Sequence, residues 1–210
     1  MIAVRVAAFL AWLVAFAASM GAFVYLIGFV GNRYTFNSID SGVQLPTAEA
    51  AWRDLLLLAL FGAQHSLMAR RAHRTLYLAA TAVVLFVLFF KWEPMPRFVW
   101  ETAVRWPFET LFWGGWALAL WAAASANPLD TFGAKQAWAA LLGVQHKPPA
   151  FTTAGPYRWG KHPMMLGLLV AFWSTNEMSQ GHLLFAAGMT AYVLVGVRRE
   201  NRYFERFPMQ

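Results

Sequence analysis

The sequence predicts an all-α fold, a polytopic transmembrane helical bundle of five to six spans. Three observations lead to this prediction: 59% of the 210 residues are apolar, only 13% are charged, and the apolar residues gather in long runs. A helix needs about 20 apolar residues to cross roughly 30 Å of hydrocarbon. We therefore expect residues 1–210 to form a single integral membrane domain in contact with a lipid bilayer.

Six apolar runs are the candidate spans, and they lie at 3–30, 52–69, 76–91, 108–126, 164–178 and 181–198. The first run exceeds the 7–15 residues of a signal-peptide core and shows no typical cleavage site, so we expect it to be retained. Segment 91–107 mixes tryptophans with charges, which is typical of an aromatic belt at the headgroup level. The turn at 174–182, with Glu177 and His182, is expected to be solvated.

The basic residues predict the orientation in the membrane. If the N-terminus is inside, 12 of the 17 Lys and Arg residues fall on the cytoplasmic side, as the positive-inside rule requires. We expect both termini in the cytoplasm and a location in a bacterial inner membrane. The charge of +7 is spread over helix ends, so no nucleic-acid partner is predicted. The absence of cysteine excludes disulfides, thiolate metal sites and cysteine nucleophiles, and no metal site is predicted.

The longest polar segment, 127–163, should lie on the cytoplasmic side. Within it, AKQAWAALLG has a helical apolar pattern that ends at Gly143, which predicts a short interfacial helix. Asn127 and Asp130 are residue types that cap helices, and we expect them to cap this one.

The stretch GPYRWGKHPMMLG, residues 155–167, turns from polar to apolar within a few residues. Pro163 suits the first position of a helix, which places His162 at about the N-cap. Helix N-termini attract anions, and Arg158 and Lys161 add positive charge. The pattern predicts a site for a carboxylate or phosphate at the membrane surface. The alternative is that the cations only anchor the helix end at lipid headgroups.

Two further stretches carry candidate residues. In VRRENRYFER, residues 197–206, Glu200 either pairs with neighbouring arginines on a solvated surface or offers a carboxylate to a ligand hydroxyl or ammonium group. In 52–71, Asp54 and His65 lie about three turns apart on one helix face. Polar groups inside a span are costly and face the bundle interior. His65 is a candidate general base, haem ligand or helix-packing hydrogen-bond partner.

The order of these stretches resembles a known family. GPYRWGKHPMMLG is similar to the G-P-Y-R-x-x-R/K-H-P-x-x-x-G signature of the isoprenylcysteine carboxyl methyltransferase-like superfamily, and VRRENRYF is similar to its R-x-E-E segment, with Asn201 as the second glutamate's replacement. FGAQHSLMAR, SANPLDTFGAKQAW and residues 162–198 resemble the membrane methanethiol S-methyltransferases of the NnrU-like branch. The resemblance covers most of residues 55–206.

The resemblance implies methylation of a small thiol with S-adenosylmethionine, at a pocket formed by the cytoplasmic loop and the C-terminal segment. It implies that the cofactor contacts Tyr157, Arg158, His162, Pro163, Arg198 and Glu200. A small thiol is mostly protonated at neutral pH, because alkyl thiols titrate above about 8.5. We therefore expect His65 to act as the base, with Arg158 or a neighbouring cation favouring the thiolate. Carboxyl methylation of a lipidated peptide and haem binding through His65 remain alternatives.

Overall fold

The computed structural model describes residues 2–69, 73–147 and 154–206, with side chains described as far as Arg202. Helices form most of this part of the chain. In chain order the elements are α1 (Ile2–Val30), α2 (Thr47–Met68), α3 (Arg74–Lys91), β1 (Phe98–Glu101), α4 (Trp106–Ser125), α5 (Pro128–Thr131), α6 (Ala134–Leu142), the 3-10 helix η1 (Gly155–Arg158), α7 (Pro163–Trp173), β2 (Glu177–Ser179) and α8 (Gln180–Arg206).

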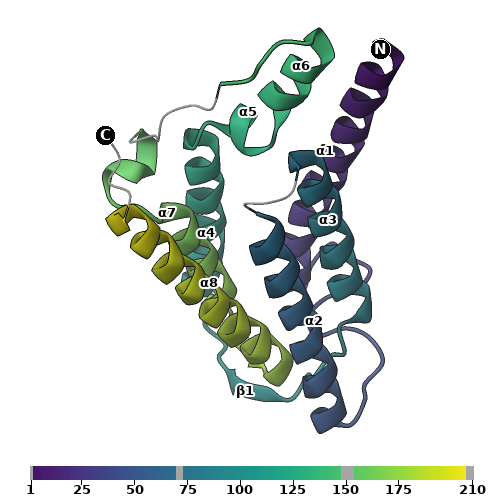
Figure 1. Ribbon diagram of the computed structural model, residues 1–210. Helices are drawn as coiled ribbons and strands as arrows, with labels where there is room; N and C mark the ends of the chain where they lie inside the picture. Colours follow the sequence, from purple (N-terminus) through teal and green to yellow (C-terminus); the bar gives the residue numbers. More distant parts are fainter. Residues whose placement is uncertain (1, 70–72, 148–153, 207–210) are drawn as a thin grey trace.

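The helices form two groups that diverge from one end of the molecule (Figure 1). The first group consists of α1, α2 and α3, and the second of α4, α7 and α8, with α2 packed against α8 between them. We call the end that carries β1 and β2 the strand end. The opposite end, where α8 finishes near η1 and where α1 begins, is the motif end (Figure 1). Helix α1 thus begins, and helix α8 ends, at the motif end.

Within the described residues, three helices are long and apolar enough to cross a membrane: α1, α3 and residues Gln180–Arg202 of α8. These helices make the chain an integral membrane protein. Helix α2 has 22 residues and α4 has 20, and neither is among these three helices. Helix α7 ends at Trp173 after 11 residues, about 16 Å, which is shorter than the run predicted at 164–178 and too short to cross hydrocarbon alone.

The chain after α7 forms a short strand that the sequence did not indicate. Strand β2 pairs antiparallel with β1, and Trp100 lies opposite Met178. Most of the predicted aromatic belt at 91–107 therefore becomes a strand and its flanking turns. Trp92 is buried and donates its indole N–H to the Ile39 carbonyl at 3.1 Å, whereas Trp106 is exposed.

Glycines bring α4 and α7 into backbone contact. A Cβ atom on Gly115 would lie 2.6 Å from the Ala171 nitrogen, and one on Gly167 would lie 2.6 Å from the Ala119 nitrogen. Small residues four apart on both helices therefore interlock, which is a common way for membrane helices to associate. This contact fixes the position of the α7 N-terminus against α4.

Aromatic side chains fill the core, which lies mainly toward the strand end. Trp116 contacts Phe23, Phe112 and Phe172 with ring centroids 5.5 to 6.1 Å apart. These rings come from α1, α4 and α7, so they join the two helix groups. Toward the motif end a smaller cluster around Trp12 and Leu78 packs α1 and α3 against the α5–α6 segment.

The short helix predicted within 127–163 is confirmed as α6, whose C-cap Gly143 has φ +75°; its position at the membrane interface stays a prediction. The predicted capping role of Asn127 and Asp130 is wrong, because neither α5 nor α6 has a side-chain cap hydrogen bond. Asp130 is buried and instead pairs with Lys135 Nζ at 2.7 Å and His146 Nε2 at 3.0 Å. A buried carboxylate needs such partners to offset its lost hydration, and here they tie the chain after α6 back to α5.

Candidate functional site

Helix η1 places the first residues of the GPYR motif against the end of α4. Gly155 has φ +54°, a conformation that favours glycine, and a Cβ there would clash with the Ser125 hydroxyl. Pro156 is buried and Tyr157 is half-buried. Trp159 is exposed and contacts Trp121 of α4 edge-on, with centroids 5.3 Å apart. The glycine and proline therefore anchor η1 so that Tyr157 faces the rest of the motif.

Helix α7 begins where the sequence predicted. Pro163 occupies its first turn and His162 is the N-cap residue, with no side-chain cap hydrogen bond. The Leu166 N–H donates to the His162 carbonyl at 3.1 Å. The first N–H groups of a helix have no intrahelical acceptor, so those of Met164 and Met165 face the loop at this end.

His162 joins α7 to the C-terminal part of α8. Its Nε2 lies 3.0 Å from Asn201 Oδ1, and its Nδ1 lies 3.5 Å from Glu200 Oε2. Both ring nitrogens thus face oxygen acceptors from consecutive residues of α8. The His162 side chain is 19% exposed and that of Glu200 is 40% exposed, so the carboxylate remains open to a ligand while the imidazole is held in place.

Tyr157 belongs to the same cluster. Burial raises the pKa of its phenol above the ordinary value, and the negative charge of Glu200 raises it further. The phenol is therefore neutral throughout the physiological range and can donate a hydrogen bond. Tyr157, His162, Glu200 and Asn201 come from η1, the α7 N-cap and α8, and we call these four residues the motif-end cluster.

Two residues assigned with this cluster lie at its margin. Arg158 is exposed on η1. Arg198 is exposed on α8 and is about 200° from Glu200 around the helix axis, because each residue advances about 100°. Among the described contacts, none links either guanidinium to His162 or Glu200. Their predicted roles as cofactor contacts stay predictions.

His65 lies apart from the motif-end cluster, between α2, α3 and α8. Its Nε2 is 2.8 Å from the Tyr77 hydroxyl oxygen, and its ring packs against Phe61 and Tyr192. Tyr192 precedes Glu200 by eight residues on α8, about 12 Å along the axis. Asp54, on the same face of α2, is fully buried near the strand end and accepts the Glu93 N–H at 3.0 Å. Asp54 therefore secures the end of α3 and is remote from His65.

Sequence reasoning did not single out Tyr77 or the partner role of Asn201. Tyr77 could have been found from its position, because His65 is the fourth residue from the end of α2, Tyr77 is the fourth residue of α3, and the two helices pack against each other. Asn201 was visible only as a departure from the family motif. Its contact depends on α8 reaching the α7 N-cap, which no local pattern encodes.

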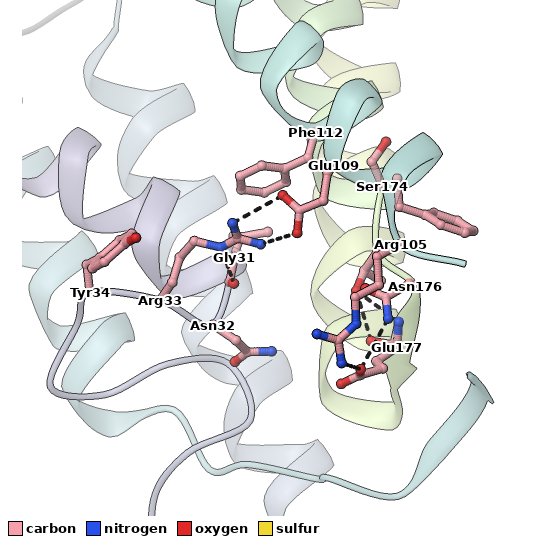
Figure 2. A pocket seen from close by; sticks show the side chains of 13 residues that line it. Gly31, Asn32, Arg33, Tyr34, Arg105, Glu109, Phe112, Ser174, Asn176 and Glu177 are labelled. Carbon is pink, nitrogen blue, oxygen red and sulfur yellow. Dashed lines mark hydrogen bonds and ion pairs between the residues drawn. The ribbon is translucent and has the colours of Figure 1, made fainter. Parts of the chain in front are cut away.

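The strand end holds a pocket of about 490 Å³, lined by the loop after α1, the start of α4 and the turn before β2. Figure 2 shows two ion pairs in its wall. Arg33 binds Glu109 with both terminal nitrogens, at 2.6 and 3.1 Å, and Arg105 lies 3.3 Å from Glu177. These charged groups are paired with each other, so the pocket wall offers a ligand few unpaired charged groups.

The expectation that His182 is solvated is wrong. It is 1% exposed because the α7–β2 turn folds under α8. Its Nε2 donates to the Phe172 carbonyl at 2.8 Å, and its backbone N–H donates to the Ser179 hydroxyl at 2.9 Å. The Ser179 hydroxyl in turn donates to Asp40, so this histidine belongs to the framework of the strand end.

Comparison with known proteins identifies the family. A scan against protein-family models gives no match, and no solved structure matches the chain. The chain is 38% identical to methanethiol S-methyltransferase 2 of Bradyrhizobium diazoefficiens over 94% of its own length and 82% of that protein. It is 37% identical to the methanethiol S-methyltransferase of Mycobacterium tuberculosis, over 86% and 81% of the two chains. The corresponding protein of Pseudomonas deceptionensis is 38% identical, over 82% and 72%.

The three alignments cover most of the chain. The resemblance inferred from the GPYRWGKHP and VRREN stretches is thereby confirmed. The chain belongs to the methanethiol S-methyltransferase family.

Proposed function

We propose that the protein transfers a methyl group from S-adenosylmethionine to the sulfur of methanethiol and releases dimethyl sulfide. The names of its relatives support the substrate and the type of reaction. The observation that carries the proposal is the convergence of His162, Glu200 and Asn201, at 3.0 and 3.5 Å, at the N-terminus of α7. This convergence joins a cationic helix end to an accessible carboxylate.

The residues present fit S-adenosylmethionine. Its carboxylate suits the free N–H groups at the start of α7, where the helix dipole favours negative charge. Its ammonium group or ribose hydroxyls need an acceptor, and Glu200 offers an accessible carboxylate. Tyr157 adds a neutral phenol beside Glu200, and Pro163 leaves the helix end unobstructed. Arg158 and Arg198 add positive charge at the rim of the same site.

When bound, S-adenosylmethionine supplies a methyl group activated by its positive sulfur. The protein contributes orientation of the thiol and removal of its proton, since alkyl thiols titrate above about 8.5. We assign the proton removal to His65, an imidazole between apolar helices with its ring fixed by Phe61 and Tyr77. Exclusion of water from such a site strengthens the thiolate as a nucleophile.

We further propose that the motif end faces the cytoplasm of a bacterial cell and that α2, α4 and α7 complete the membrane domain beside the three apolar helices. The cations of the motif end support this orientation through the positive-inside rule. An apolar thiol could then enter through the bilayer, while the charged cofactor enters from the water.

Headspace gas analysis tests the function directly. Purified protein in nanodiscs, given S-adenosylmethionine and methanethiol, should release dimethyl sulfide at a rate that depends on both. Glu200→Gln should weaken S-adenosylmethionine binding measured by calorimetry, whereas Glu109→Gln, at the strand end, should not. Cofactor binding without dimethyl sulfide formation would contradict methanethiol as the substrate. A lack of binding would contradict S-adenosylmethionine as the cofactor.

A further inference from the structure

Tyr77 is the immediate partner of the His65 imidazole. The Tyr77 oxygen lies 2.8 Å from His65 Nε2 and 3.2 Å from His65 Nδ1, and the two ring centroids are 5.2 Å apart. Beside this pair, the Gln64 amide donates to the Thr81 hydroxyl at 3.3 Å. Gln64 and His65 belong to α2, and Tyr77 and Thr81 belong to α3, so the packing of these two helices holds the phenol against the imidazole.

The position of the Tyr77 oxygen, near both ring nitrogens, has a chemical consequence. A neutral imidazole carries one proton and one lone pair, and a phenol both donates and accepts. In the tautomer that carries its proton on Nδ1, the Tyr77 hydroxyl can donate to Nε2 at 2.8 Å. The lone pair that makes His65 a base is thus already engaged by Tyr77, so a thiol reaches that lone pair through the phenol.

A cation lies beside this pair. The guanidinium carbon of Arg74 is 5.4 Å from the centroid of the Tyr77 ring, and Arg74 is the first residue of α3. Nearby positive charge stabilises an anion, so Arg74 would partly offset the cost of forming a thiolate at the Tyr77 hydroxyl.

We propose that Tyr77 is a catalytic residue that accepts the thiol proton while passing its own proton to His65. The sulfur–hydrogen bond breaks, and the sulfur keeps the electron pair. A new oxygen–hydrogen bond forms on Tyr77 as its original proton moves to His65 Nε2. The result is a thiolate and an imidazolium, with Tyr77 unchanged. This relay rests on the proposed thiol methylation and names the residue that meets the substrate.

The pH dependence of Tyr77→Phe separates a relay from a structural role. At pH 7 the variant should be about 100-fold slower, a usual contribution of acid–base catalysis. It then depends on thiolate formed in solution, which increases about tenfold for each pH unit below the thiol pKa. The deficit should therefore shrink steadily as pH rises from 7 to 9. A deficit of constant size across this range would overturn the relay.

Tyr25→Phe is the matched control, because it also removes a phenol hydroxyl from an aromatic cluster. The Tyr25 hydroxyl bonds the Asn37 backbone near the strand end, away from His65. This variant should keep the wild-type pH profile. A Tyr25→Phe profile that changes in the same way as that of Tyr77→Phe would assign the effect to packing and overturn the proposal.

A second measurement needs no cofactor and no turnover. Methanethiol added to cofactor-free protein at neutral pH should develop the ultraviolet band of a thiolate in the wild type and in Tyr25→Phe, and less of it in Tyr77→Phe. Equal bands in all three proteins would contradict the relay. If the wild type forms thiolate but never dimethyl sulfide, the proposed function fails while the relay survives, so the two failures are distinguishable.

Discussion

The two ends of the molecule use polar residues in opposite ways. At the strand end, charged and polar groups are paired with one another: Arg33 with Glu109, Arg105 with Glu177, and Asp40 with Ser179. At the motif end, Glu200 is 40% exposed, and its ion-pair partner, the His162 ring, is 3.5 Å away. The first arrangement leaves little for a ligand, whereas the second leaves a carboxylate partly exposed.

This difference indicates a division of labour between stability and binding. Buried polar groups must be hydrogen-bonded to offset their lost hydration, and the strand end meets this need with its own residues. His182 is an example, since it is buried yet donates to the Phe172 carbonyl at 2.8 Å. At the motif end, by contrast, the Glu200 carboxylate is partly exposed and so keeps part of its hydration. The strand end also holds a pocket of about 490 Å³, so a cavity alone does not distinguish the end that we propose binds the cofactor.

Cysteine labelling should give the largest contrast between the two ends, because each position is either labelled or unlabelled. The chain contains no cysteine, so one introduced thiol reports one position. Tyr34 is 97% exposed at the strand end and Trp159 is 74% exposed at the motif end. In intact cells an impermeant maleimide should label Tyr34→Cys and leave Trp159→Cys unlabelled until the membrane is opened. The reverse pattern would refute the proposed orientation.

The next largest effect should come from Glu200. Replacement by Gln preserves shape but removes the charge that faces His162 and the ligand, and a hydrogen bond to a charged group contributes about 1.5–3 kcal/mol. We expect the dissociation constant for S-adenosylmethionine to rise by about 10- to 100-fold, with the thermal unfolding midpoint unchanged. Calorimetry and a melting curve measure the two quantities. Unaltered affinity would remove Glu200 from the cofactor site.

Gly167 tests how the framework supports the motif end. A Val side chain at 167 would collide with α4 backbone atoms 2.6 Å from the Cβ position, and overpacking of this kind costs about 1–3 kcal/mol. Helix α7 should shift as a unit and carry His162 away from Asn201, so cofactor affinity and thermal stability should both fall. Gly114→Val is the control, since nothing lies within 4 Å of its Cβ position. Equal behaviour of the two variants would contradict the described α4–α7 contact.

Local patterns predicted much of this architecture. Apolar periodicity and length placed the helices, Pro163 and Gly143 marked a start and an end that the structure confirms, and the family motif indicated the type of reaction. These features depend on neighbouring residues, so they can be read from one sequence. The end of α7 at Trp173 was missed because the residues after it pair with β1, 76 to 81 positions earlier in the chain.

The features that sequence reasoning missed all depend on long-range contacts. Asp130 has the residue type of a helix cap, but a buried carboxylate gains more from Lys135 and His146 than from free N–H groups. His182 follows a polar turn, yet the turn folds inward beneath Phe172. Asn201 gains its partner only when α8 meets the start of α7. In each case the folded surroundings decide which of several possible hydrogen bonds forms.

The smallest effect is expected from Glu109→Gln at the strand end. This variant gives the sharpest test of the difference between the two ends. The Arg33–Glu109 pair is bidentate and its side chains are about one-third exposed, so solvent screening limits its contribution to stability to about 1 kcal/mol or less. Glu109→Gln should lower the melting temperature slightly and leave both cofactor affinity and dimethyl sulfide formation within about twofold of wild type. A loss of activity comparable to that of Glu200→Gln, at unchanged stability, would place function at the strand end and reverse the division between the two ends.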